Sequence, residues 1–127
     1  MSYNKLLPYS TVQYIGQIQE FPYTFTPYGW IECDGQLLSV DNYSYLYSVI
    51  GDTYGSSGTV SFGVPDLRPK DGSGNVISLT VGQTYNGKPY MKSFIALEGV
   101  YPGTQSMYWF SKYRVLKYYI LLKQQML

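Results

Sequence analysis

Two carboxylates and a thiol stand next to one another in the chain, at Glu32, Cys33 and Asp34. In an extended segment Glu32 and Asp34 point to the same side, and a pair of carboxylates is the arrangement that glycoside hydrolysis uses. Asp34 is followed by Gly35, however, and an Asp-Gly pair is typical of a tight turn between strands. We therefore interpret Asp34 as a turn residue and Glu32 as a solvated partner, and not as a catalytic pair.

The thiol of Cys33 lacks the partner that a catalytic cysteine needs. The chain contains no histidine, and Cys33 is its one cysteine. This composition excludes Ser-His-Asp and Cys-His catalytic pairs, Cys/His zinc sites and intrachain disulfides. Cys33 also alternates with Ile31 on the apolar side of its segment. We expect a buried structural thiol, no catalytic residue and no enzyme.

One further segment resembles a ligand-binding loop in part. Asp71, Ser73 and Asn75 place oxygen atoms at alternating positions, as the opening of a calcium loop does. Gly82, however, stands where such a loop has its bidentate glutamate, and the glycines in between do not continue into a phosphate-binding pattern. We interpret this stretch as a glycine-rich turn and predict no metal and no cofactor.

The elements that must position these residues are short. A chain of 127 residues, 45% hydrophobic and 13% charged, is long enough for one packed domain and too short for two. Alternating or β-rich sequence predicts strands at 30–34, 76–81 and 93–100. Turn signals recur between them at close spacing, at Pro27-Tyr28-Gly29, Asp34-Gly35, Gly55-Ser56-Ser57-Gly58, Pro65-Asp66, Asp71-Gly72-Ser73-Gly74 and Asn86-Gly87.

One segment follows a helical period instead. Apolar residues recur at i, i+3, i+4 and i+7 from Tyr43 to Ile50, and Gly51 follows where a helix-ending glycine belongs. This predicts one short helix at about 42–50, capped by Ser39 or Asp41. The expected fold class is therefore α+β, mainly β. The residues expected in or beside the core are Trp30, Leu38, Leu46, Ile50, Phe62 and Leu67.

Tyrosine dominates the aromatic residues, with 16 Tyr beside 5 Phe and 2 Trp. Tyrosine suits half-wet surfaces such as interfaces and sugar-contacting sites, because its ring can be buried while its hydroxyl keeps a partner. It is also a common residue of strands, so composition alone leaves both interpretations open. Tyr54, Tyr85 and Tyr90 lie beside glycine or proline turns and are the candidate recognition surface. The alternative is that they pack at subunit contacts.

The end of the chain differs in composition from the rest. Residues 105–127 carry a charge of +4 with no acidic residue, whereas the whole chain carries +1. We interpret residues 104–127 as an appended assembly element, helical or extended. Its apolar run at 118–122 lacks a clean polar face, so burial against protein, in a neighbouring subunit or its own domain, fits better than a membrane surface. The candidate assembly surface is Trp109, Phe110, Tyr113, Leu116, Ile120 and Leu121.

Several motifs follow one another in a specific order. The run from Gly29 to Leu38 reads Gly-Trp-x-x-Cys-Asp-Gly-Gln-Leu-Leu, and Phe62 to Arg68 reads Phe-x-Val-Pro-Asp-Leu-Arg. With a closing Phe94-Ile95-Ala96-Leu97, this order resembles the phage tail collar domain of short tail fibres and microcystin-dependent proteins, over roughly residues 16–103. The motif positions that we interpret as scaffold are Gly29, Trp30, Cys33, Asp34, Gly35, Pro65, Asp66, Leu67 and Arg68.

The resemblance implies a non-enzymatic structural and adhesion protein of a phage tail or tail fibre, located in the virion. It implies a homo-oligomer, with a trimer favoured, which contacts other tail proteins and a host-surface glycan. The expected organisation is an N-terminal arm at 1–15, a tail-collar-like domain at 16–103 and the extension at 104–127. The chain departs from the family in its short segment between Arg68 and the closing strand, which has no histidine.

Two alternatives from other classes stay open. One is a carbohydrate-binding module, and the other is a secreted bacterial protein that polymerises into an extracellular filament. The N-terminus has only two consecutive apolar residues before Pro8, so we expect no cleavable signal peptide. No apolar run approaches the roughly 20 residues of a membrane span, and a net charge of +1 argues against nucleic acid.

Overall fold

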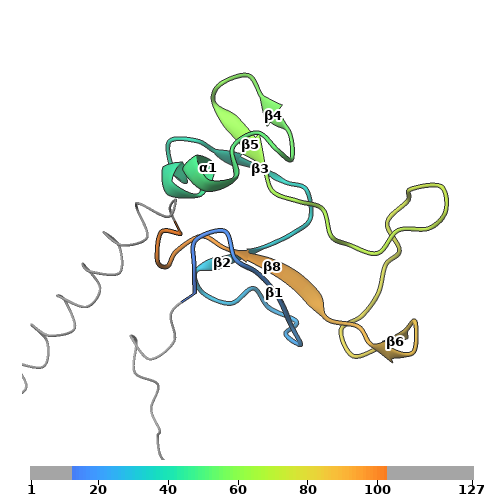
Figure 1. The fold of residues 1–127 in the computed structure, drawn as a ribbon. Coiled ribbons are helices and arrows are strands. Elements are labelled where there is room, and N and C mark those ends of the chain that lie inside the picture. Colours follow the sequence, from blue (N-terminus) through green and yellow to red (C-terminus); the bar gives the residue numbers. More distant parts are fainter. Residues whose placement is uncertain (1–12, 103–127) are drawn as a thin grey trace, which may run out of the picture.

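The computed structural model describes residues 13–102. They form a small, mainly β fold with one short helix (Figure 1), which confirms the α+β class. The candidate assembly residues Trp109, Phe110, Tyr113, Leu116, Ile120 and Leu121 lie outside the described residues, as do most of the expected N-terminal arm at 1–15 and all of the extension at 104–127.

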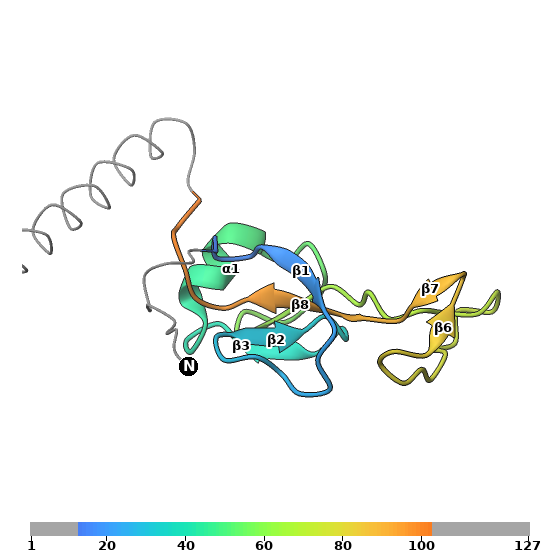
Figure 2. The same cartoon turned by 90° about the horizontal axis from the view of Figure 1, so that it is seen from below.

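A three-stranded antiparallel sheet has the order β1-β8-β2, with β1 at Ile18–Phe21, β8 at Lys92–Ala96 and β2 at Trp30–Glu32. Ile95 of β8 lies opposite Ile18 on one side and Ile31 on the other. The last strand of the described chain therefore fills the middle of the sheet (Figure 2). The strands expected at 30–34 and 93–100 are both present but end earlier, at residues 32 and 96.

The second sheet has the order β3-β5-β4, with β3 at Leu37–Ser39, β5 at Ser61–Gly63 and β4 at Ser56–Ser57. A separate hairpin joins β6 at Thr84–Tyr85 to β7 at Lys88–Pro89. These are the short strands that the closely spaced turns predict.

The helix α1 spans Ser44–Ile50. Its end is as expected, because Gly51 has a positive φ of 59° and donates its N–H to the Tyr47 carbonyl at 2.7 Å. The expected cap is wrong: Tyr43 occupies the N-cap position and makes no side-chain cap bond. The Ser39 hydroxyl instead accepts a bond from the Asn42 amide at 3.3 Å, in the turn before the helix.

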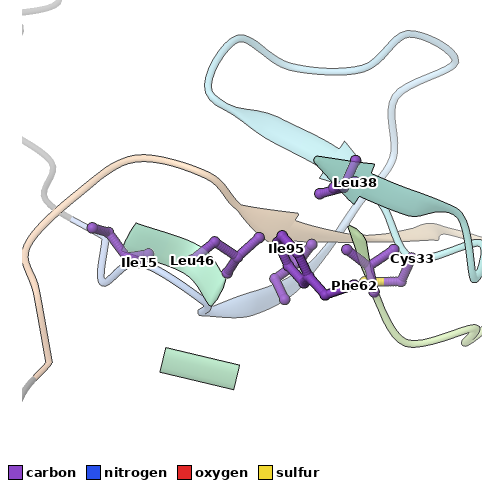
Figure 3. Packing of buried hydrophobic residues seen from close by; sticks show 7 residues of the cluster. Ile15, Cys33, Leu38, Leu46, Phe62 and Ile95 are labelled. Carbon is purple, nitrogen blue, oxygen red and sulfur yellow. The ribbon is translucent and has the colours of Figure 1, made fainter. Parts of the chain in front are cut away.

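The core lies where α1 meets the two sheets. Leu46 of the helix packs there with Ile95 and Phe62 (Figure 3). Each such side chain contributes roughly 1.5 to 3 kcal/mol by leaving water. The buried cluster consists of Ile15, Cys33, Leu38, Leu46, Phe62, Val64 and Ile95.

The expected core is confirmed at Leu38, Leu46 and Phe62, and Ile50 packs against it half-buried. Trp30 is also half-buried, edge-on to the ring of Phe21. The expectation for Leu67 is wrong, since its side chain is 48% exposed. Leu67 contributes through its backbone, because its N–H bonds to the Cys33 carbonyl at 2.9 Å while its side chain faces outward.

Residues 67–91, which we call the arm, leave this core and return to it. The arm runs out from β5 and carries the β6–β7 hairpin before it reaches β8 (Figure 1). No arm residue belongs to the core cluster. The strand expected at 76–81 is not formed among the described residues, where only an isolated bridge joins Val76 to Lys70. The expected alternation is nevertheless visible in burial, because Ile77, Leu79 and Val81 are half-buried and the residues between them are exposed.

Candidate functional site

The residues of the family-like motif come together although they are far apart in sequence. An isolated bridge joins Asp34 to Asp66, the Gly35 amide donates to the Pro65 carbonyl at 3.2 Å, and the Leu67 amide donates to Cys33. The motif from 29 to 38 and the motif from 62 to 68 are therefore two sides of one structure. Gly35 has a φ of 78°, and a Cβ there would lie 3.2 Å from the Cβ of Asp66, so this close approach favours glycine.

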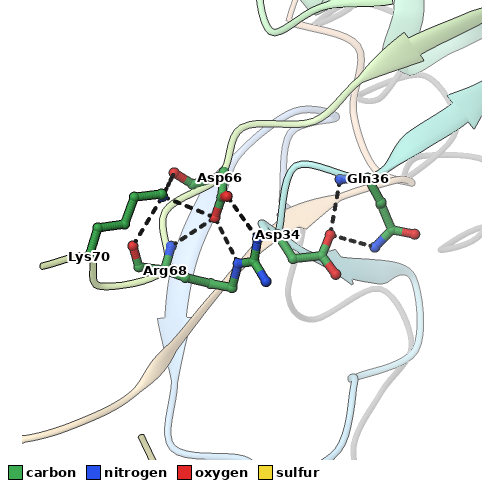
Figure 4. A network of polar contacts seen from close by, with 5 residues as sticks. All are labelled: Asp34, Gln36, Asp66, Arg68 and Lys70. Atoms are coloured by element: carbon green, nitrogen blue, oxygen red, sulfur yellow. Dashed lines mark hydrogen bonds and ion pairs between the residues drawn. The ribbon is translucent and has the colours of Figure 1, made fainter. Parts of the chain in front are cut away.

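The carboxylates of this structure are used to hold turns (Figure 4). Asp34 Oδ1 accepts bonds from the backbone and side-chain amides of Gln36, at 3.1 and 2.9 Å. Asp66 accepts two bonds of 2.8 Å from the Arg68 guanidinium, a forked pair, and Lys70 approaches it to 3.3 Å. These bonds fix the chain direction where it leaves the core.

The Arg68 side chain holds the pKa of Asp66 well below its usual range. A carboxyl whose pKa is lowered on folding stabilises the fold above its unfolded pKa, near 4, and this contribution fades as the pH falls below that value. We expect Asp66→Asn to lower the thermal midpoint at pH 7. The difference from the unsubstituted chain should shrink as the pH falls below 4, because the unfolded carboxyl then takes up a proton that the folded, paired carboxylate does not, which favours unfolding of the unsubstituted chain. Thermal unfolding followed by circular dichroism between pH 7 and pH 2.5 measures this, and a pH-independent difference would contradict it.

The candidate catalytic residues are not arranged for catalysis. Burial, with the neighbouring charges of Asp34 and Glu32, raises the pKa of the Cys33 thiol to about 12, so its nucleophilic thiolate is suppressed. Glu32 lies 3.8 Å from the Lys92 ammonium, and Asp34 is engaged by Gln36. Cys33 is 1% exposed, which agrees with the structural role expected of it.

The segment that resembles a calcium loop is a turn closed on itself. Asp71 Oδ1 accepts bonds from the Ser73 and Asn75 amides, both at 2.9 Å. These backbone bonds, that from Asn75 first, lower the pKa of Asp71. The carboxylate thus holds its own turn, and residues 13–102 contain no cluster of three potential metal ligands.

The three candidate recognition tyrosines do not share one surface. Tyr54 is 47% exposed in the turn before β4, while Tyr85 and Tyr90 are half-buried in and beside the β6–β7 hairpin. Burial raises the pKa of Tyr90, followed in effect by the charge of Glu32. Figure 1 shows β4 and β6 on separate protrusions.

A different aromatic surface is built by residues that the sequence analysis did not single out. Phe21, Tyr23 and Phe25 form a ladder of nearly parallel rings, with centroids 5.1 and 5.0 Å apart and interplanar angles of 8° and 7°. Phe25 is 63% exposed, and nearby Tyr28 is 92% exposed. The sequence signal for the ladder is the alternation of aromatic residues at 21, 23 and 25, which places their rings on one side of an extended segment.

The comparisons support the resemblance expected from the motifs. The family model of the Phage Tail Collar Domain matches residues 16–71, a range that contains every scaffold position from Gly29 to Arg68. The comparisons with curated proteins and with solved structures found no match. The family match ends before most of the arm and before β8, although β8 is the central strand of its sheet.

Proposed function

We propose, from the premise that residues 16–71 match the phage tail collar domain, that this chain is a non-enzymatic tail or tail-fibre protein that assembles with copies of itself. The collar domain indicates a structural protein of a phage tail, and self-assembly and host attachment are the finer steps of the proposal. The supporting observation is that the polar side chains of the motif are engaged in hydrogen bonds within the domain. Asp34, Asp66 and Arg68 all hold turns, so the motif serves as a scaffold and leaves no pair of free carboxylates.

The surface of the described residues supports an assembly. In the ladder of Phe21, Tyr23 and Phe25, neighbouring rings cover most of one another's faces. The ladder therefore presents ring edges and one outer ring face. Such a surface is suited to packing against protein. We propose further that residues 16–103 form the domain and that an N-terminal arm at 1–15, distinct from the arm at 67–91, precedes it. We also propose that residues 104–127 contact a neighbouring subunit in the virion. A trimer is the favoured number.

The mass of the full chain under native conditions tests the self-assembly. A single small oligomer that persists on dilution is the expected result. A monomer would contradict the proposal and favour the carbohydrate-binding module, and a broad ladder of masses would favour a filament. No helix among residues 13–102 has the length and apolar character needed to cross a membrane.

Host attachment is the second part of the proposal, and three tyrosines are its candidates. Tyr54 is exposed in a turn, and Tyr85 and Tyr90 are half-buried in and beside the β6–β7 hairpin, and such protruding segments commonly carry binding residues on a rigid scaffold. Contact with a host glycan through these rings is separable from assembly by single alanine substitutions. A variant that keeps the native mass of the oligomer and loses glycan binding supports attachment. A variant that loses the oligomer without a separate binding defect contradicts it.

A further inference from the structure

Residues 76–81 have the signature of a strand and an open backbone. Side chains alternate between half-buried and exposed over all six residues. The Ile77 amide donates to the Pro69 carbonyl at 2.8 Å, but within residues 13–102 the amides of Ser78 and Leu79 donate no hydrogen bond. Successive amides of an extended segment point to opposite edges, so the Ser78 amide points away from Pro69. Among the described residues this edge is therefore available to a further strand at Val76 and Ser78, while the Thr80 amide on the same edge donates to Gln83 Oε1 at 3.0 Å.

The arm around this segment has little packing against the rest of residues 13–102. None of its residues enters the core cluster, and its only paired strands are the two residues each of β6 and β7. A two-stranded hairpin is marginal by itself in water. An extended arm with an apolar alternation and few internal contacts is the kind of element that a neighbouring subunit covers.

Charge is segregated between the arm and the body. Residues 13–66 hold six acidic residues and no basic one, whereas all basic residues of the described range lie between 68 and 92. Three of these bases pair within the chain, with Asp66 or Glu32. Lys88, at the tip of the arm in β7, forms no ion pair within the described range, and neither does Glu20 in β1. The arm is thus complementary in charge to the body of another copy.

β1 is the strand that fits the open edge of the arm. It lies at one border of the β1-β8-β2 sheet, so its outer backbone groups meet no strand among the described residues. Its Ile18 is 43% exposed, and Glu20 on the same strand carries the charge opposite to that of Lys88. Exposed edge strands are normally covered or strongly charged, because they pair readily with another strand.

We propose that residues 76–81 of one copy add as a strand to the edge of β1 in a second copy. Main-chain hydrogen bonds supply the contact, as in other cases of strand addition, and Lys88 approaches the acidic body of the neighbour. This inference deepens the proposed self-assembly and rests on it. It is a head-to-tail contact, since the arm and β1 are different surfaces, and such contacts form a ring where the rotation between copies closes and a filament where it does not.

Ser78→Pro and Ser78→Ala form a matched pair for the test. Proline removes the amide at the open edge, whereas alanine removes the hydroxyl and keeps the amide. The expected result is that Ser78→Pro lowers the native mass to that of smaller species at a concentration where Ser78→Ala keeps the full mass. Thermal unfolding shows whether both variants remain folded. A folded Ser78→Pro chain with the full mass overturns the inference.

Chemical cross-linking locates the contact independently of proline. Chains with Gln19→Cys and chains with Ser78→Cys are mixed, co-assembled and treated with a bismaleimide, whose span tolerates a small shift in register. Cys33 is buried and does not compete. A cross-linked pair that needs both variants is the expected product, and Ser44→Cys, at an exposed position at the start of α1, serves as the control in place of Ser78→Cys. Absence of the pair in a fully assembled sample overturns the inference, while a monomeric unsubstituted chain instead contradicts the proposed self-assembly.

Discussion

A chain that ends at Gly103 is expected to keep its fold and to lose its full assembly size. The core cluster lies entirely within residues 13–102, so the truncation removes none of it. The removed segment contains the six large side chains of the candidate assembly surface, Trp109, Phe110, Tyr113, Leu116, Ile120 and Leu121. Burial of each against a neighbour is worth roughly 1.5 to 3 kcal/mol, so several together change association by many orders of magnitude. Light scattering gives the mass, and circular dichroism confirms the fold.

Two double substitutions in the full chain separate the apolar contribution of this segment from its charge. Trp109→Ser combined with Leu116→Ser removes apolar area and keeps every charge, and it should reduce the mass as the truncation does. Lys112→Gln combined with Lys117→Gln removes two charges and should cause a smaller effect, largest at low salt, because exposed charges are screened. A truncated chain with both its fold and its full mass would show that the segment is not an assembly element.

Gly63→Ala is expected to cause a large loss of stability in the described domain. Gly63 is buried in β5, the middle strand of its sheet, and its amide donates to the Gly55 carbonyl at 2.8 Å. A Cβ at this position would clash with the backbone carbonyl of Tyr54. Since backbone on both sides must move, we expect a loss of about 3 kcal/mol, at the upper end for overpacked cores. In a domain of this size each kcal/mol lowers the thermal midpoint by about 4–8 °C.

Gly72→Ala is the matched control for this prediction. Gly72 is exposed in the arm, has no positive φ and leaves open space where a Cβ would be added. Its substitution should change the free energy of unfolding by less than about 0.5 kcal/mol. Chemical denaturation of both variants measures the difference. Equal stability of the two variants would mean that the approach of β5 to Tyr54 is not as close as the structure has it.

Sequence reasoning succeeded where a local pattern decides the structure. The helical period from Tyr43 to Ile50 with the following Gly51 is sufficient for α1, because the apolar stripe and the end signal agree. The forked pair of Asp66 and Arg68 lies at two of the positions interpreted as scaffold, where two residues of opposite charge stand two apart in a turn. The order of the motifs was also sufficient to indicate the resemblance to the collar domain, whose family model matches residues 16–71.

Sequence reasoning failed where contacts between residues far apart in the sequence decide the structure. Leu67 is exposed while its backbone amide bonds to the Cys33 carbonyl, and no local sequence pattern indicates that bond. The ladder of Phe21, Tyr23 and Phe25 was visible as an alternation, but only the sheet shows that these rings remain outside the core. The segment 76–81 has the pattern of a strand without a partner among the described residues, because pairing depends on a second strand as well as on the segment itself.

Mass spectrometry of purified particles, from the phage whose genome encodes the chain, tests the central claim most directly. If the chain is a structural protein of the tail, it is found in the intact particle and in the isolated tail fraction. Its copy number there is a multiple of the number of subunits in its native oligomer. Intact, infectious particles that lack the chain, with the protein recovered only from the surrounding medium, would contradict the assignment.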